Sequence, residues 1–390
     1  MLRVLTLSTL FPNAVQPTLG LFVERQTRAL AARPDVEVEV VAPVGLPVWP
    51  LALHPHYAPL RRLAAQEEWN GLQVHHPRYR VWPRIGQART ATAMAAALLP
   101  LLKAIRERFS FDVIDAEFFW PDGPAAMRLS QALGVPFSVK ARGSDIYLWG
   151  DRPGIGSQIR EAAEAAGGLL AVSGSLKAEM AARGLPEEKI RVHHTGVELG
   201  LFRPVDRREA KARLGVEGPL LVTAGALIPR KGQSFAIEAV AQLPEATLVL
   251  VGEGPDRGAL ERLARRVGVA GRVRFLGARP PEEVAALMAA ADVAVQPSSA
   301  EGLANVWVEA LACGTPVVTC DVGGARDVIV SPAAGRIVPR DPRAIAAAVT
   351  ELLAAAPASE EVRAAAQKFS WERNADELFG HLSQVAARAA

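Results

Sequence analysis

The sequence predicts an α/β protein made of two doubly wound parallel sheets, each with helices on both faces. Three observations support this prediction. Short apolar runs alternate with amphipathic helical segments along the whole chain, and the alternation restarts after a turn-rich segment near residue 196. The chain of 390 residues also exceeds the size at which a single hydrophobic core usually stops growing.

Each half has its own series of predicted strands. In the first half they are residues 4–8, 36–42, 72–76, 111–116, 136–140, 168–173 and 190–194, and in the second half 220–225, 246–252, 272–277, 292–297 and 315–320. The segment HHTGVELGLFRP between the halves is rich in turn formers. We therefore predict an N-terminal domain of residues 1–195 and a C-terminal domain of residues 196–369, with an amphipathic helix over 370–390 that packs back on the first domain.

Composition and charge exclude several classes of protein. Half of the residues are hydrophobic and 22% are charged, as in ordinary globular proteins, and 44 basic against 41 acidic residues do not indicate a nucleic-acid binder. Two cysteines, Cys313 and Cys320, support neither a disulfide framework nor a zinc site. Residues 1–8 resemble a first strand rather than a secretory signal, and the apolar stretch 93–102 contains Pro100 and is half the ~20 residues of a membrane helix. We expect a cytoplasmic protein.

The loops that follow predicted strands are the places to look for chemistry, because ligands bind beyond the carboxyl ends of strands in open α/β sheets. Gly20 opens a helix, where it either brings backbone N–H groups close to a phosphate or makes a plain turn. In DAEFFWPDG, Glu117 and Asp122 either face a ligand or belong to a surface loop with a helix cap at Asp122. In KARGSDIYLWGD, Arg142 either pairs with Asp145 or faces an anionic substrate.

The second half has a basic turn of its own. In AGALIPRKG, Arg230 and Lys231 stand directly before a predicted helix, which suits a polyphosphate through charge-assisted bonds of roughly 1.5–3 kcal/mol each, although a solvated turn is the alternative. The glycines of VGEGPDRGALERL are spaced GxGxxxG, and this spacing argues against a dinucleotide fingerprint and NAD. The strand end at Leu276 still offers backbone groups to the edge of a nucleobase.

The stretch EGLANVWVEALACGTPVV sets two glutamates near the start of a predicted helix. If residues 302–313 are helical, Glu301 and Glu309 are about 12 Å apart along the axis at ~1.5 Å per residue. Glycosidase carboxylate pairs are only roughly 5–9.5 Å apart, so this spacing favours an extended ligand such as a nucleotide-sugar, with its hydroxyl groups at the two acids. Its phosphates would then meet the helix-start amides of Leu303, Ala304 and Asn305. A charge on the helix dipole and an exposed glutamate are the alternative explanation.

Taken together, GALIPRKG, ADVAVQPSSAEGLANVWVEALACGTPVV and the GG pair at 323–324 resemble the family-4 retaining glycosyltransferases. GLFVERQ, DAEFFWPDG, RGSDIY and HTGVELGLFRP are similar to the first domain and hinge of the branch that builds bacterial cell-surface polysaccharides, of the teichuronic-acid type. The resemblance covers nearly the whole chain. It implies two Rossmann-like domains that face each other across a cleft (the GT-B architecture) and a nucleoside-diphosphate sugar as donor.

The resemblance also implies roles for individual residues. Lys231, with Arg230 nearby, would neutralise the departing diphosphate, Glu301 would lie by the transferred sugar, Glu309 would hold the ribose hydroxyls, and the Gly20 loop would face the phosphates. The anomeric configuration is retained in this family without a bound metal, and no DxD motif occurs in the relevant loops. We therefore expect no cofactor.

Two positions depart from the family pattern. Gly225 is followed by Ala226, where the family commonly has Gly-Arg, so Arg230 would have to supply the missing charge. Glu117 stands where relatives usually have a histidine that lines the acceptor side, so it either acts on the acceptor proton or marks an impaired site.

The sequence is interpreted as a retaining glycosyltransferase that moves a sugar to a hydroxyl of a glycan or lipid-linked acceptor. A nucleotide-sugar 2-epimerase, which needs no acceptor, and a non-catalytic sugar-nucleotide binder remain open. Residues 49–90 mix aromatic residues with arginines, which suits an anionic membrane surface, a polyanionic acceptor or a solvated loop. The mixture comprises Trp49, Trp69, Tyr79, Trp82, Arg61, Arg62, Arg78, Arg80, Arg84 and Arg89.

Overall fold

The computed structural model describes residues 1–82 and 86–388, so Arg84 lies outside the described residues. The chain forms two compact units. The N-terminal unit joins Met1–Gly196 to Trp371–Ala390, and the C-terminal unit is Val197–Ser370. Each unit contains a parallel sheet covered by helices, which confirms the predicted α/β fold class.

The N-terminal unit is organised around an eight-stranded sheet of order β10-β9-β8-β7-β1-β2-β5-β4. All neighbours are parallel except the antiparallel pair β4 and β5, and β3 and β6 form a separate two-stranded parallel ribbon. The strands are β1 (Leu2–Leu7), β2 (Val36–Val41), β3 (Val44–Pro47), β4 (Gln66–Trp69), β5 (Leu72–His75), β6 (Arg78–Val81), β7 (Val113–Ala116), β8 (Phe137–Ala141), β9 (Gly168–Ala171) and β10 (Ile190–Val192).

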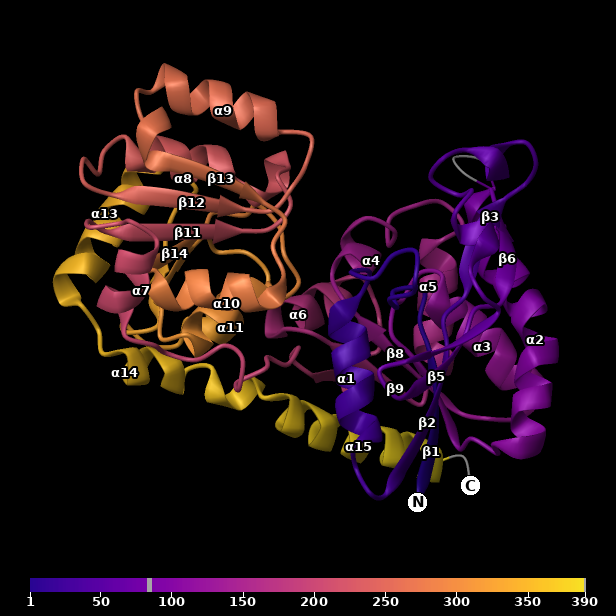
Figure 1. Ribbon diagram of the computed structural model, residues 1–390. Helices are drawn as coiled ribbons and strands as arrows, with labels where there is room; N and C mark the ends of the chain where they lie inside the picture. Colours follow the sequence, from indigo (N-terminus) through magenta and orange to yellow (C-terminus); the bar gives the residue numbers. More distant parts are fainter. Residues whose placement is uncertain (83–85, 389–390) are drawn as a thin grey trace. The chain divides into compact units, whose positions relative to one another are not determined.

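Helices cover both faces of this sheet. Figure 1 shows α1 on one side of the strands and α2 and α3 on the other. The helices are α1 (Leu21–Ala31), α2 (Thr90–Arg108), α3 (Asp122–Leu133), α4 (Ser144–Tyr147), α5 (Gly156–Ala165), α6 (Gly174–Ala182) and α15 (Trp371–Ala387). The α6 helix begins where the Ser173 hydroxyl accepts the N–H of Leu176 at 3.1 Å, an ordinary N-cap.

The last helix, α15, belongs to the core of the N-terminal unit. It packs against α1, β7 and β8, and buries Leu378, Leu382 and Val385 in the cluster that contains Val4 of β1. Each such side chain contributes about 1.5–3 kcal/mol when buried. Polar contacts add specificity, because Ser138 Oγ lies 2.7 Å from His381 Nε2.

The C-terminal unit contains a six-stranded parallel sheet of order β13-β12-β11-β14-β15-β16. Figure 1 shows α8 and α9 on one side of it and α10 and α11 on the other. The strands are β11 (Leu220–Ala224), β12 (Thr247–Val251), β13 (Val273–Gly277), β14 (Val293–Gln296), β15 (Val317–Thr319) and β16 (Gly335–Ile337). The helices are α7 (Arg207–Arg213), α8 (Gln233–Val240), α9 (Arg257–Arg266), α10 (Pro281–Ala290), α11 (Asn305–Ala312), α12 (Ala325–Val328), α13 (Pro342–Ala355) and α14 (Ser359–Ala364).

Every strand predicted from the sequence is present, while β3, β4, β6 and β16 were not predicted, because these short strands carry little periodic signal. Pro100 lies inside α2 rather than ending it. The segment Gln87–Arg108 has the length and apolar composition of a membrane span. Met94, Leu98 and Leu102 on this helix are nevertheless buried, and α2 packs against α3, as a core helix does.

Candidate functional site

The strand order places the candidate phosphate-binding residues at one point of the C-terminal sheet. Strands β12 and β13 lie on one side of β11, and β14 pairs with β11 on its other side. The carboxyl ends of β11 and β14 thus flank the position where ligands bind in doubly wound sheets. Lys231 follows β11 and Glu301 follows β14, and Lys231 Nζ lies 2.6 Å from Glu301 Oε1.

Arg230 completes this ion pair from the same turn. Its Nη1 donates to Ala300 O at 2.6 Å and lies 3.3 Å from Glu301 Oε2, so the carboxylate contacts both cations. The Glu301 side chain is 8% exposed, whereas Lys231 is 18% and Arg230 46% exposed. Two adjacent positive charges at a partly buried carboxylate can also bind a phosphate.

Close backbone contacts hold the loop that carries these cations. Gly232 has φ +74, and a Cβ atom there would lie 2.2 Å from Pro297 O. Arg340 Nε and Nη2 donate to Pro297 O and Pro229 O, both at 2.8 Å, so the loops after β11 and β14 are bound together. Arg340 was not predicted, because it lies after β16, far from both loops along the chain.

Gly225 directly follows β11 and has φ +140, a conformation that favours glycine. Its N–H donates to Val251 O at 2.9 Å, and a Cβ on Gly252 would lie 2.0 Å from Gly225 O. The loop therefore passes close to the end of β12. Where the family pattern has arginine, the Ala226 carbonyl accepts from Gln233 Nε2 at 2.9 Å.

The helix after β14 is shorter than predicted. It begins at Asn305 rather than at 302, so Glu301 lies in the preceding turn and the 12 Å separation along a helix axis does not apply. Gly323 fixes this turn, because at φ +49 its missing Cβ would lie 2.2 Å from Glu301 O. The first N–H groups of a helix have no intrahelical partners and can bind an anion. Of the three residues predicted to supply such amides, the last two are the N-cap and the first residue of α11, and the first lies one position before the cap. These residues are Leu303, Ala304 and Asn305.

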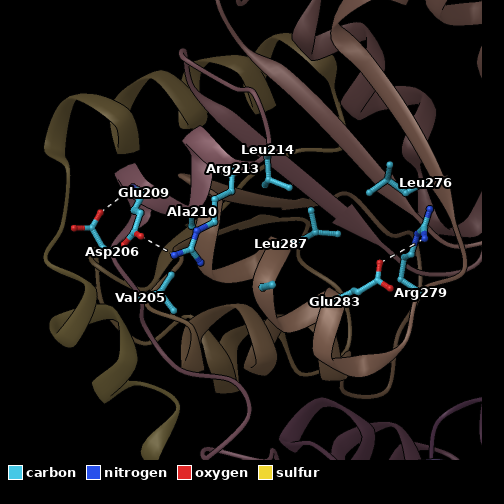
Figure 2. Close-up of a pocket in the computed structure, with 11 residues that line it drawn as sticks. Val205, Asp206, Glu209, Ala210, Arg213, Leu214, Leu276, Arg279, Glu283 and Leu287 are labelled. Atoms are coloured by element: carbon cyan, nitrogen blue, oxygen red, sulfur yellow. Dashed lines mark hydrogen bonds and ion pairs between the residues drawn. The ribbon is translucent and has the colours of Figure 1, made fainter.

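Two further predicted donor contacts are Glu309 and Leu276. Glu309 is one turn into α11 and half-buried. The Leu276 side chain lines a pocket of about 470 Å³ between α7 and α10, with Leu214 and Leu287 (Figure 2). Of the residues predicted to contact the donor, Leu276 alone is among the described residues that line this pocket. The prediction for Leu276 concerned its backbone groups, which were expected at the edge of a nucleobase, and not its side chain.

In the N-terminal unit, Gly20 and Arg142 both lie at the start of α1. Gly20 caps α1 at φ +63, and a Cβ there would lie 2.2 Å from Leu10 O, so packing alone already requires glycine. The Arg142 guanidinium lies 4.9 Å from the ring centroid of Phe22 in the first turn of α1. Its side chain is 5% exposed, and its buried Nη1 has no hydrogen-bond partner in the part of the chain that the structure describes.

Glu117 is fully buried and has both carboxylate oxygens occupied. Gln26 donates to Oε1 and Arg142 Nη2 to Oε2. Burial alone would raise the pKa of Glu117, but Arg142 and Lys140 hold it below its usual value. The predicted action on an acceptor proton would require this ion pair to open, so in this structure Glu117 positions Arg142.

A buried lysine extends this network. Lys140 Nζ lies 2.7 Å from His193 Nδ1, and burial lowers the pKa of Lys140 well below its usual range. Burial likewise lowers the pKa of His193, whose Nε2 lies 2.9 Å from Asn374 O of α15. Neither His193 nor Gln26 was predicted, because His193 follows β10, Gln26 lies on α1, and the two meet at Lys140 only in the fold.

Asp145 holds two loops together instead of pairing with the Arg142 side chain. Its fully buried carboxylate accepts the N–H groups of Phe119 (2.9 Å), Arg142 (3.0 Å) and Gly143 (2.8 Å). Any part that it plays in acceptor binding is therefore indirect. Asp122 bonds the N–H of Thr9 at 2.8 Å, which ties the loop after β1 to α3.

The aromatic and basic segment 49–90 divides between surface and interior. Trp49 is exposed, whereas Tyr79 is buried and Trp69 packs against the core beside α1. The predicted surface mixture is therefore smaller than expected, since alternate residues of β4 and β6 point inward. In the described ranges 1–82 and 86–388, no group of three or more His, Cys, Asp or Glu side chains is arranged to hold a metal.

Comparison with known proteins shows the family of this chain. Residues 206–369 match the family described as glycosyl transferases group 1, and residues 19–201 match glycosyltransferase family 4. The D-inositol 3-phosphate glycosyltransferase of Acidothermus cellulolyticus is 32% identical over 319 residues, which cover 74% of this chain and 70% of the relative. The chain belongs to the group 1/family 4 glycosyltransferases. This glycosyltransferase is also 29% identical over 368 residues to TuaC of Bacillus subtilis, a glycosyltransferase ascribed to teichuronic acid biosynthesis, with 90% of this chain and 88% of TuaC covered.

Solved structures confirm that the fold of this glycosyltransferase is of the GT-B type. Sucrose-phosphate synthase from Thermosynechococcus elongatus matches with a TM-score of 0.81 at 23% identity, over 100% of both chains. Anabaena HepE in complex with UDP matches with a TM-score of 0.76 at 21% identity, over 98% of this chain and 100% of HepE. At these identities the likeness concerns the fold.

Proposed function

We propose that this glycosyltransferase transfers a sugar from a nucleoside-diphosphate sugar to a hydroxyl of a glycan or lipid-linked acceptor, with retention of the anomeric configuration. The observation that carries the proposal is the contact of Lys231 with Glu301, with Arg230 beside them, at the switch point of the C-terminal sheet. The match to HepE, whose structure contains UDP, and to TuaC supports a nucleotide-sugar donor and a role in polysaccharide synthesis.

Each residue of this cluster has a separate part in the proposed reaction. Lys231 and Arg230 stabilise the negative charge that develops on the diphosphate as the glycosidic bond breaks. Glu301 orients Lys231 and accepts hydrogen bonds from hydroxyls of the transferred sugar, while Glu309 binds the ribose. The amides before α11 bind phosphate oxygens. These cations supply the positive charge, so the proposed reaction needs no metal, and activity should persist in EDTA.

A thermal-shift screen against UDP-, GDP-, ADP- and CDP-sugars tests the donor class, since a ligand that binds only the folded state raises its stability. The absence of any shift would contradict the proposal. The selected donor is then incubated with the protein alone and with candidate acceptors. An epimerised sugar in the absence of acceptor would identify the 2-epimerase, and binding without turnover would identify a non-catalytic binder.

We further propose that the enzyme is cytoplasmic and contacts the inner face of an anionic membrane. The support is a short exposed apolar segment beside arginines. Val48, Trp49, Leu51 and Leu53 are 42%, 78%, 52% and 54% exposed, and Arg61 and Arg62 are exposed on the following turn. Apolar side chains next to cations bind an anionic lipid surface through both burial and charge.

Co-sedimentation with vesicles tests this contact. Vesicles that contain phosphatidylglycerol should bind the protein more strongly than pure phosphatidylcholine vesicles, and Trp49→Ser with Leu51→Ser should abolish the difference. Val330→Ser is the matched control, because Val330 is 56% exposed in the C-terminal unit. Equal sedimentation with both kinds of vesicle would contradict the proposal.

A further inference from the structure

A pocket of about 290 Å³ opens beyond the carboxyl ends of β1 and β2 in the N-terminal unit. The loop after β1, the β2–β3 connection, the turn before Leu60 and strand β6 form its walls. Its described lining includes Tyr79 of the aromatic and basic segment 49–90, but none of the catalytic, donor-binding or acceptor-side residues predicted from the sequence. Its place at the carboxyl edge of a doubly wound sheet is one where ligands bind.

The lining of this pocket combines apolar and aromatic surface with uncharged polar groups. Phe11, Val44, Leu60 and Val81 supply aliphatic and aromatic surface, and the rings of His56 and Tyr57 meet edge to face at 4.7 Å between centroids. The lining residues with polar side chains are Thr9, Asn13, Gln16, Tyr79, His56 and Tyr57. Within the described ranges 1–82 and 86–388, its lining residues include no Lys, Arg, Asp or Glu.

The surrounding fold makes Tyr79 and Asn13 hydrogen-bond donors at the pocket. A Cβ on residue 45 would lie 3.0 Å from Tyr79 Oη and 2.8 Å from Val81 Cγ1, so Gly45 leaves space for the phenol at the pocket wall. Burial raises the pKa of Tyr79, so its hydroxyl remains a donor at neutral pH. Asn13 Oδ1 accepts the N–H groups of residues 15 and 16 at 3.0 and 2.9 Å, which leaves its Nδ2 group as the donor for a ligand.

This combination fits a neutral pyranose. A sugar ring presents an apolar C–H face to aromatic side chains and hydroxyls to a few fixed polar groups, as in ordinary ligand pockets. Among the described lining residues, a uronate or a phosphate would lose its hydration without meeting a Lys or Arg side chain. We propose that the pocket is a subsite for an uncharged sugar residue of the acceptor glycan. The proposal rests on the proposed function, since it assigns the acceptor class of the same enzyme.

Saturation-transfer NMR on the full chain tests this assignment with three probes: methyl α-D-glucopyranoside, methyl N-acetyl-β-D-glucosaminide and methyl β-D-glucuronoside. At least one neutral probe should bind. Tyr79→Phe removes only the hydroxyl, and Asn13→Asp keeps the Oδ1 that caps the turn but replaces the Nδ2 donor. Each should raise the Kd of the neutral probe about 3- to 10-fold, the loss of one hydrogen bond. Tyr147→Phe is the matched control, because Tyr147 lies on α4 and does not line the pocket.

Binding of no neutral probe, unchanged affinity in both variants, or preference for the glucuronoside would overturn the proposal. If Tyr79→Phe fails to fold, Asn13→Asp alone decides. The thermal shift with the selected nucleotide-sugar should be unchanged in both pocket variants. Protein that binds a neutral glycoside at this pocket but no nucleotide-sugar would refute the donor proposal and support the pocket as a sugar site, so the two failures are distinguishable.

Discussion

Replacement of Lys231 by alanine is expected to lower turnover far more than stability. Lys231 Nζ lies 2.6 Å from Glu301 Oε1 at the point where the proposed diphosphate leaves. Loss of one preorganised donor to a developing anion costs about 10²–10³ in turnover, or roughly 2.7–4 kcal/mol. Glu301 keeps Arg230 at 3.3 Å, so the loss of stability should stay below the roughly 3–5 kcal/mol of a fully unpaired buried charge.

The chain contains a matched control for this variant. Lys211 Nζ lies 2.9 Å from Asp292 Oδ2, the Lys211 side chain is also 18% exposed, and the carboxylate keeps a second donor in the N–H of Leu220 at 2.7 Å. This pair lies at the amino end of β14, at the opposite edge of the sheet from Lys231. Lys211→Ala should therefore lose similar stability and no turnover.

Both variants are compared by thermal melting and by release of nucleoside diphosphate from the donor that the screen selects. The expected pattern is a similar shift in Tm, with turnover lost in Lys231→Ala alone. Near-normal turnover in Lys231→Ala would refute the role of this ammonium group. An equal loss in Lys211→Ala would show that the effect comes from damage to the C-terminal unit as a whole.

Three further predictions concern residues elsewhere in the molecule. Glu309→Ala should weaken binding of the matching nucleoside diphosphate by about 10- to 100-fold, the loss of hydrogen bonds to a charged group, and unchanged affinity by calorimetry would count against a ribose contact. Gly323→Ala should reduce both stability and turnover, because at φ +49 the added Cβ would lie 2.2 Å from Glu301 O and displace the turn that carries Glu301. Gly271→Ala is the control: its Cβ would meet no atom within 4 Å, so it should be neutral in melting and turnover assays. Burial lowers the pKa of His381 to about 4 from 6.5, so the unfolded chain binds the extra proton between these values and stability falls as pH drops below about 6.5. Through His381, the free energy of unfolding should fall by about 2 kcal/mol between pH 7.5 and pH 5. Denaturant unfolding at both pH values should show that His381→Leu loses less stability than the parent protein, by that amount. An identical loss of stability in both proteins would exclude His381 as the source.

Local patterns in the sequence determined twelve of the sixteen described strands, the division into two α/β halves and the identity of the basic turn and the two glutamates. Strands such as β1 and β11 are short apolar runs bounded by turn formers, and such signals need no knowledge of distant residues. Lys231 and Glu301 were found in the same way, from motifs that follow strands. Their contact was not, because it depends on β11 and β14 being neighbours in the sheet.

Only the tertiary structure decided which polar side chains have their hydrogen bonds filled within the protein and which can bind a ligand. Glu117 and Asp145 looked like ligand-facing acids in their loops, but the fold buries both and fills their hydrogen bonds with groups from other elements. Tyr79 looked like a surface aromatic, but β6 turns it toward the end of the sheet, where it lines a pocket. The physical reason is that burial and pairing depend on neighbours far away in sequence, whereas strand and turn signals depend on residues a few positions apart.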